Sequence, residues 1–195
     1  MSGIPTRQEA LTLMHEYTDN VNLRKHMYAV EAAMRAYAGK YGEDADVWGV
    51  TGLLHDFDYE RYPNDAQAPD RDHPSHGVAI LRERGVSEDI LHAIMAHASF
   101  TGVKPETLMA RTILAVDELT GFIVACALVR PNRIMDLKPK SVKKKMKDRS
   151  FAAAVNRDEM RESCETLGED FSEHIAFVIE SMRGIADQLG LQAGQ

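Results

Sequence analysis

The sequence predicts an all-α protein, and three observations support this fold class. Apolar residues recur at helical spacing along most of the 195-residue chain. Capping residues precede several of these stretches, and proline or glycine follows several of them. The sequence contains no β-hairpin signal and no alternating run of useful length. With 44% hydrophobic and 27% charged residues and no linker, the chain is expected to form one globular domain over residues 1–195.

The first two predicted helices are set by a cap and by an apolar pattern. Thr6, with Glu9 three residues later, has capping-box spacing and opens a helix through about Tyr17. Residues 20–40 continue with apolar side chains at helical spacing, and His26 lies on or beside the buried face. A core histidine that bonds a carbonyl oxygen would explain this position equally well.

The third predicted helix begins after residues 42–44 and carries His55 and Asp56 at its C-terminal end. An adjacent imidazole and carboxylate can bind one metal ion from two directions, although most such pairs are solvated turn residues. Residues 58–72 contain prolines, an asparagine and many charges, so they are expected to form a loop beside this pair.

The next two predicted helices also carry histidines. A fourth helix begins in residues 73–85, and Ser87 is expected to cap a fifth that runs through about Ala98. His97 stands at the C-terminal end of the fifth helix, whereas His92 lies off its apolar line.

A long helix is predicted from Pro105 to Arg130, where Pro131 ends it. Asp117 is an acid among the apolar residues of this helix. Burying such an acid is costly unless it is paired or bound to a metal.

The C-terminal part combines a basic segment with two amphipathic helices. Residues 133–149 hold eight Lys or Arg and two Asp, a net charge of +6, so the rest of the −7 chain carries −13. Ser141 is expected to cap a short helix here. Further helices are predicted over 157–167 and 171–189, where Asn and Asp stand at capping-box spacing from Glu.

Composition also limits the function. The net charge of −7 argues against general nucleic-acid binding. Cys126 and Cys164 have no paired spacing, so reduced thiols are expected. The N-terminus lacks an apolar signal core, and the longest apolar run, residues 122–129, is too short to span a bilayer. A cytoplasmic protein without membrane contact is expected.

Six side chains on successive predicted helices are candidate metal ligands, four imidazoles and two carboxylates. Such a nitrogen and oxygen set suits Fe, Mn, Co, Ni or Zn better than Ca or Mg. The six residues are His26, His55, Asp56, His73, His97 and Asp117.

The order of these residues resembles the HD-domain superfamily of metal-dependent phosphohydrolases, over roughly residues 20–125. The segment HPSHGVAIL is similar to a superfamily segment that selects His73 over His76 as a ligand. ILHAIMAHA likewise selects His97 over His92, and AVDELTG resembles the helix whose Asp completes the first metal site. The resemblance implies an HD-like helical bundle at about 20–125 with additional C-terminal helices at about 131–190.

The resemblance also implies a division of roles among the ligands. His26, His55, Asp56 and Asp117 would hold a first divalent metal, and Asp56 would bridge to a second ion held by His73 and His97. The presence of the two middle histidines implies a dinuclear site, which suits phosphoester hydrolysis. Asp56 would be the catalytic residue.

Substrate contacts are less defined. Phe57, Asp58 and Tyr59 replace the Ile, Gly and Lys of the HDIGK form, which removes a cation. Arg61 is one candidate substitute, and a solvated loop arginine is the alternative. Further candidate phosphate contacts are Lys140, Lys143 and Lys144, on what is otherwise a solvated face. Glu118 is a candidate to orient a ligand histidine, or a surface ion-pair partner.

The six candidate ligands are compatible with three different functions. The leading expectation is hydrolysis of a nucleotide or another small phosphate ester. A di-iron oxygenase of the HD type is the second, because the same six ligands serve that chemistry. A non-catalytic metal- or nucleotide-binding module is the third. Neither the substrate nor the oligomeric state follows from the sequence.

Overall fold

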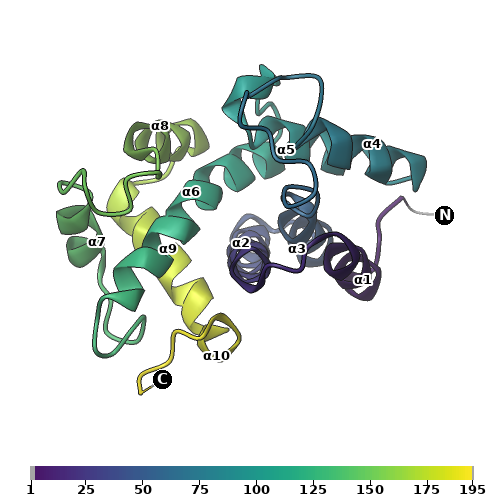
Figure 1. Cartoon of the computed structure of the whole chain (residues 1–195). Helices are drawn as coiled ribbons and strands as arrows, with labels where there is room; N and C mark the ends of the chain where they lie inside the picture. Colours follow the sequence, from purple (N-terminus) through teal and green to yellow (C-terminus); the bar gives the residue numbers. More distant parts are fainter. Residues whose placement is uncertain (1–2, 195) are drawn as a thin grey trace. The chain divides into compact units, whose positions relative to one another are not determined.

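The computed structural model describes residues 3–194, which form ten α-helices and one 3₁₀ turn, with no β-strand among them (Figure 1). The predicted all-α class is confirmed. The elements are α1 (Arg7–Tyr17), α2 (Val21–Tyr41), α3 (Ala45–Leu54), α4 (Ser75–Glu83), α5 (Glu88–Ala96), η1 (Ser99–Thr101), α6 (Leu108–Leu128), α7 (Pro139–Lys145), α8 (Arg157–Leu167), α9 (Phe171–Arg183) and α10 (Ala186–Leu189).

The chain divides into two compact units, one up to Leu114 and one from Ala115, so the division falls within α6. Each unit is therefore described by itself. The single domain expected over residues 1–195 stays a prediction. Among the described helices, none combines the length and apolar character that crossing a membrane requires.

In the first unit, α2 and α3 pack closely because α3 presents glycines to α2. A Cβ atom on Gly52 would lie 3.1 Å from backbone atoms of Glu31, and one on Gly49 would lie 2.5 Å from the Arg35 side chain. The absence of side chains at these two positions lets the helices approach. The close approach fixes the end of α3, where His55 follows.

A buried carboxylate also ties α1, α2 and α3 together. Glu31, which is 4% exposed, accepts hydrogen bonds from Arg7 Nε at 2.6 Å and Arg35 Nε at 2.9 Å. Arg35 Nη1 in turn donates to Asp46 Oδ1 at the start of α3, at 2.8 Å. Because Glu31 is paired from two sides, its burial is compensated.

The helices of the first unit begin and end at defined capping residues. Thr6 and Glu9 form the reciprocal capping box. Asp44 accepts from two backbone N–H groups at the start of α3, and His55 is the C-cap residue of that helix. Ser87 occupies the predicted N-cap of α5, although its side chain makes no capping hydrogen bond.

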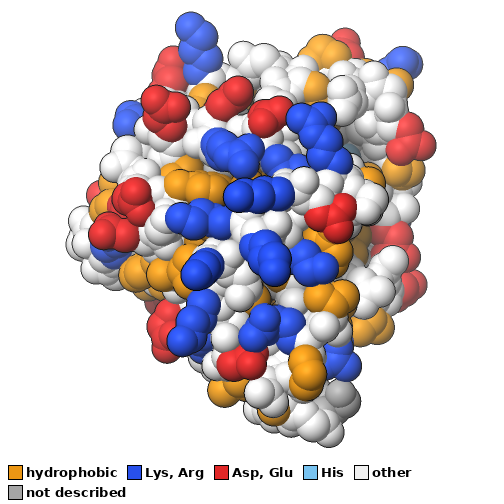
Figure 2. Space-filling model, turned by 90° about the vertical axis from the view of Figure 1, so that its left-hand side faces the viewer, with side chains coloured by type: hydrophobic (Ala, Val, Ile, Leu, Met, Phe, Trp, Pro, Cys, Tyr) orange, Lys and Arg blue, Asp and Glu red, His pale blue; other side chains and the backbone are white. Residues whose placement is uncertain are grey.

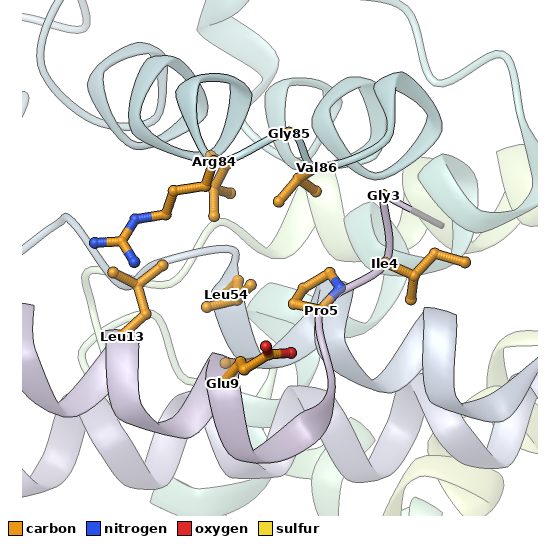
Figure 3. A pocket seen from close by; sticks show the side chains of 11 residues that line it. Gly3, Ile4, Pro5, Glu9, Leu13, Leu54, Arg84, Gly85 and Val86 are labelled. Atoms are coloured by element: carbon orange, nitrogen blue, oxygen red, sulfur yellow. The ribbon is translucent and has the colours of Figure 1, made fainter. Parts of the chain in front are cut away.

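The first unit also contains a pocket of about 570 Å³ (Figure 3). The N-terminal segment, α1 and the turn after α4 surround it, and Leu54 lines it directly before His55. None of the candidate ligands lines this pocket. Its lining residues are Gly3, Ile4, Pro5, Glu9, Ala10, Leu13, Leu54, Leu81, Arg84, Gly85 and Val86.

Three predicted helix boundaries are corrected by the structure. Helix α6 begins at Leu108 rather than at Pro105. Lys138 is the N-cap of α7 and a proline is its first residue, so Ser141 lies inside the helix rather than at its cap. The helix predicted over 171–189 is two helices, because Gly184 ends α9 and Ile185 leaves the helical conformation.

The interior of the second unit is held by polar contacts to backbone carbonyls as well as by apolar packing. The imidazole Nε2 of buried His174 lies 3.0 Å from the carbonyl oxygen of Ala115. Arg183 donates to the carbonyl oxygens of Ile134 at 3.1 Å and Leu137 at 2.6 Å. These bonds fix the segment between α6 and α7 against α9.

Candidate metal centre

The first unit brings four histidines around the carboxylate of Asp56. His55 and His97 are the C-cap residues of α3 and α5, His26 lies in α2, and His73 lies just before α4. Three helix ends and one helix face therefore supply the side chains, which are separated widely in the sequence.

Asp56 is the centre of this arrangement. Its Oδ1 lies 3.3 Å from Nε2 of His73, 3.4 Å from Nε2 of His55 and 3.5 Å from Nε2 of His97. Its Oδ2 lies 3.6 Å from Nε2 of His26. One carboxylate thus faces the same ring nitrogen of all four imidazoles.

The opposite ring nitrogens are held by oxygen acceptors. Nδ1 of His55 lies 2.8 Å from the carbonyl oxygen of Gly52, and Nδ1 of His97 lies 2.5 Å from that of Ile94. A carbonyl oxygen has no proton to give, so each Nδ1 carries the proton of the neutral ring and donates it. Nε2 then presents its lone pair toward Asp56, which is the tautomer that metal binding requires.

His73 is held in the same way by a carboxylate. Asp58, which is 1% exposed, accepts from Nδ1 of His73 through Oδ1 at 2.8 Å and from the backbone N–H of Gly77 through Oδ2 at 2.7 Å. Burial lowers the pKa of His73, but the hydrogen bond to Asp58 and the charge of Asp56 outweigh it, so the pKa is raised overall.

The sequence pattern does not identify Asp58 as a site residue. The only signal was that an acid replaced the Gly of the HDIGK form two residues after Asp56. Its role also explains Gly77, because a Cβ atom there would lie 2.6–2.8 Å from the Asp58 carboxylate. The glycine in HPSHG therefore makes room for the group that orients His73.

The distances fit a metal ion. Ligand atoms of His55, Asp56 and His97 lie within 4.8 Å of one another. Atoms bonded to one ion at about 2.1 Å are separated by up to roughly 4 Å, so small side-chain movements bring these atoms into coordination range. The Nε2 atoms of His26 and His55 are 3.3 Å apart, close enough for both to bind one ion. This donor set suits a transition metal.

The centre is enclosed on one side and open on the other. His55, His73 and His97 are buried, whereas the side chains of His26 and Asp56 are 22% and 14% exposed. A ligand therefore has access to the centre beside these two residues.

His76 and His92, which are not expected to be metal ligands, make other contacts in the first unit. The ring of His76 packs on Tyr62, with centroids 3.7 Å apart. Nδ1 of His92 is buried without a hydrogen-bond partner among the described residues. The structure thus gathers His73 and His97 around Asp56, as expected, and their role as ligands stays a prediction.

The other candidate residues lie in the loop between α3 and α4, on α6 and on α7. The Arg61 guanidinium donates to the carbonyl oxygen of Glu16 and lies 4.5 Å from the ring centroid of Tyr17. Asp117 and Glu118 lie on the part of α6 that belongs to the second unit. Lys140, Lys143 and Lys144 lie on α7, where Lys143 Nζ donates to Ser172 Oγ at 2.6 Å. Their proposed functions stay predictions.

Comparison with known proteins points to one family. A family model described as HD domain matches residues 23–121. Ribonuclease Y of Oleidesulfovibrio alaskensis is 31% identical over 100 residues, which covers 51% of this chain and 18% of that relative. The chain thus spans less than a fifth of the length of the curated relative it matches. No solved structure matches the chain.

Proposed function

Because the chain belongs to the HD-domain family, we propose that it is a metal-dependent phosphohydrolase that cleaves a phosphoester of a nucleotide or another small phosphate ester. The observation that carries this proposal is the position of Asp56, whose carboxylate faces Nε2 of four imidazoles. Three of these imidazoles are oriented through Nδ1. An oriented set of nitrogen and oxygen donors supports metal binding.

We assign the ligands as the family resemblance implies. His26, His55, Asp56 and Asp117 would hold a first divalent metal. Asp56 would also contact a second ion, held by His73 and His97. Metals of the Fe, Mn, Co, Ni or Zn type supply Lewis acidity and lower the pKa of bound water.

The protein's own residues have distinct tasks in this proposal. The carbonyls of Gly52 and Ile94 hold His55 and His97 so that Nε2 points inward. Asp58 does the same for His73 and adds negative charge near the ligands. The exposed side of Asp56 and His26 gives the phosphate its approach, while the buried histidines keep bulk water from the other side.

The candidate substrate contacts are cationic side chains. Lys140, Lys143 and Lys144 remain candidates to contact the phosphate. Arg61 remains one too, although its guanidinium is already engaged by Glu16 and Tyr17. The relative matched over part of its length is named as a ribonuclease, so phosphodiesters belong among the esters to be tested.

The proposal is tested by metal analysis followed by an activity panel. Purified protein is stripped, reloaded with Mn²⁺, Ni²⁺ or Fe²⁺, and assayed on an aryl phosphate, an aryl phosphodiester and nucleoside phosphates. We expect metal-dependent hydrolysis that is lost in Asp56→Asn. Oxygen consumption by the iron-loaded protein, without phosphoester hydrolysis under any metal, would instead establish an oxygenase.

A further inference from the structure

The second unit contains a pocket of about 490 Å³ with cationic walls. It lies between the end of α6 and α7, and its volume is typical of small-molecule sites. Its lining residues are Cys126, Val129, Arg130, Leu137, Ser141, Lys144, Lys145 and Asp148. Three cations and one carboxylate among them give the lining a net charge of +2.

The two lysines contribute most to this charge because neither forms an ion pair. Lys144 is exposed and has no hydrogen-bond or ion-pair partner among the described residues. Lys145 is half-buried, and its ammonium lies 4.5 Å from the ring centroid of Phe151. Both side chains line the pocket, so an anion bound there would meet two positive charges that no carboxylate pairs.

The acids near the pocket are already engaged. Asp136 accepts from Arg130 Nε at 3.0 Å, and Asp148 accepts from the hydroxyl and the backbone N–H of Ser150. The hydrogen bonds from Ser150 lower the pKa of Asp148, so it is ionised near neutral pH. It remains the one negative group in the lining.

The floor of the pocket is uncharged. Cys126 and Leu137 are buried there, and Val129 adds exposed apolar surface. Burial raises the pKa of the Cys126 thiol to about 11, against the opposing effect of Lys145, Arg130 and Arg157. The thiol is therefore neutral at physiological pH, and it does not repel an anion.

The surrounding surface extends this positive field. Seven Lys or Arg occur between residues 138 and 149, and Figure 2 shows blue side chains gathered on the face that carries α7. Such a field would attract an anionic ligand in a chain whose overall charge is −7.

From this pocket we propose that the second unit binds a small phosphate-bearing molecule with an apolar or planar part, of the nucleotide class. Lys144, Lys145 and the Ser141 hydroxyl contact the phosphates, and the non-phosphate part lies over Val129 and Leu137. Lysine is a frequent phosphate ligand, whereas a single carboxylate would leave part of the +2 lining charge unmatched. The inference does not depend on the proposed hydrolase activity, and it assigns Lys144 to this pocket instead of to the ester that would be cleaved at the metal centre.

The test is isothermal titration of the full-length protein with ADP, pyrophosphate and adenosine. We expect ADP to bind with a stoichiometry of one, pyrophosphate to bind more weakly, and adenosine not to bind. Lys144→Gln and Lys145→Gln should each weaken ADP binding roughly tenfold or more, because each removes a charged contact. Lys147→Gln is the matched control: it removes the same charge from an exposed neighbour that does not line the pocket.

Three results would overturn the proposal. If Lys147→Gln weakened ADP binding as much as Lys144→Gln, the nucleotide would be attracted by the overall positive charge of this surface rather than bound in the pocket. Loss of ADP binding in Asp56→Asn with retention in Lys144→Gln would place the nucleotide at the metal centre. Binding of a long single-stranded oligonucleotide without binding of ADP or pyrophosphate would identify a polyanion surface. Thermal melts of every variant check that the fold is kept.

Discussion

The carboxylate of Asp58 occupies the space that a Cβ atom on Gly77 would need. An ideal Cβ at Gly77 would lie 2.6 Å from Cγ of Asp58, and the Gly77 N–H donates to Oδ2 of the same group. The start of α4 and the orientation of His73 are therefore fixed by one contact. Asp58 is a positioning residue, since it acts on the centre through His73.

Gly77→Ala should displace Asp58 and release His73. Because the clash is with a buried carboxylate, we expect lower affinity for one of two metals and a lower melting temperature. Gly39→Ala is the matched control, because Gly39 lies in a helix with no atom within 4 Å of an added Cβ. It should be neutral or stabilising by up to about 1 kcal/mol. Metal content unchanged in Gly77→Ala would refute the positioning role of Asp58.

His73→Ala should remove one of two metals, whereas His76→Ala should leave the metal content unchanged and activity within a few-fold. The difference follows from geometry, since His73 Nε2 lies 3.3 Å from Asp56 and His76 packs on Tyr62. Elemental analysis under saturating Mn²⁺ measures both variants beside the wild type. A wild-type protein that holds a single ion would contradict the dinuclear assignment.

Asp56→Asn should weaken both metal sites and abolish turnover while the fold persists. The amide keeps the size of the side chain and loses its charge, and the helices bury their apolar residues independently of it. Metal binding to the native state contributes RT ln(1 + [L]/Kd), roughly 3–4 kcal/mol at a hundred- to thousandfold excess over Kd. Thermal melts with and without chelator should therefore show a drop for the wild type and almost none for the variant. Identical melts for the wild type, together with turnover by the variant, would exclude this centre.

The two thiols should be unreactive in the folded protein. Burial raises the pKa of Cys126 and Cys164 from 9.0 to about 11, so little thiolate is present at pH 8. An aromatic disulfide reagent should react with neither thiol before denaturant is added, and with both afterwards. The raised pKa also makes the free energy of unfolding depend on pH. The stabilisation from the two neutral thiols is complete below pH 9, and it is lost as the pH rises toward 11 because the thiols ionise first in the unfolded state. Fast reaction of either thiol in native protein would contradict this burial.

Much of the fold and part of the centre were predictable from the sequence. Helical spacing located the helices, and the order of the histidines, read with the family resemblance, anticipated their approach to Asp56. Asp58 was not predictable, because its contact with Gly77 depends on how residues 58–73 fold back. Asn64 holds this loop in place, because its side-chain amide donates to the carbonyl oxygens of Ala68, Arg71 and His73. No sequence pattern predicts these hydrogen bonds.

The predicted helix boundaries were wrong where two local sequence signals indicated different positions. Ser141 is a good capping residue, but Pro139 at the first position of α7 moved the cap to Lys138. The apolar pattern of residues 171–189 continues through Gly184, although the backbone leaves the helix there. The spacing of apolar residues indicates which face of a helix is buried. It does not reveal a break in the helix when the apolar spacing continues on the other side of the break.

His55 and His97 each close the last turn of the helix that carries them, through Nδ1 and a carbonyl oxygen three residues earlier. Fraying of either helix end would therefore swing an imidazole away from Asp56, and an ion held at Nε2 would oppose that fraying. Metal binding should thus slow amide hydrogen exchange in the last turns of α3 and α5 more than elsewhere in these helices. The metal centre and the two helix ends would then share one local opening equilibrium.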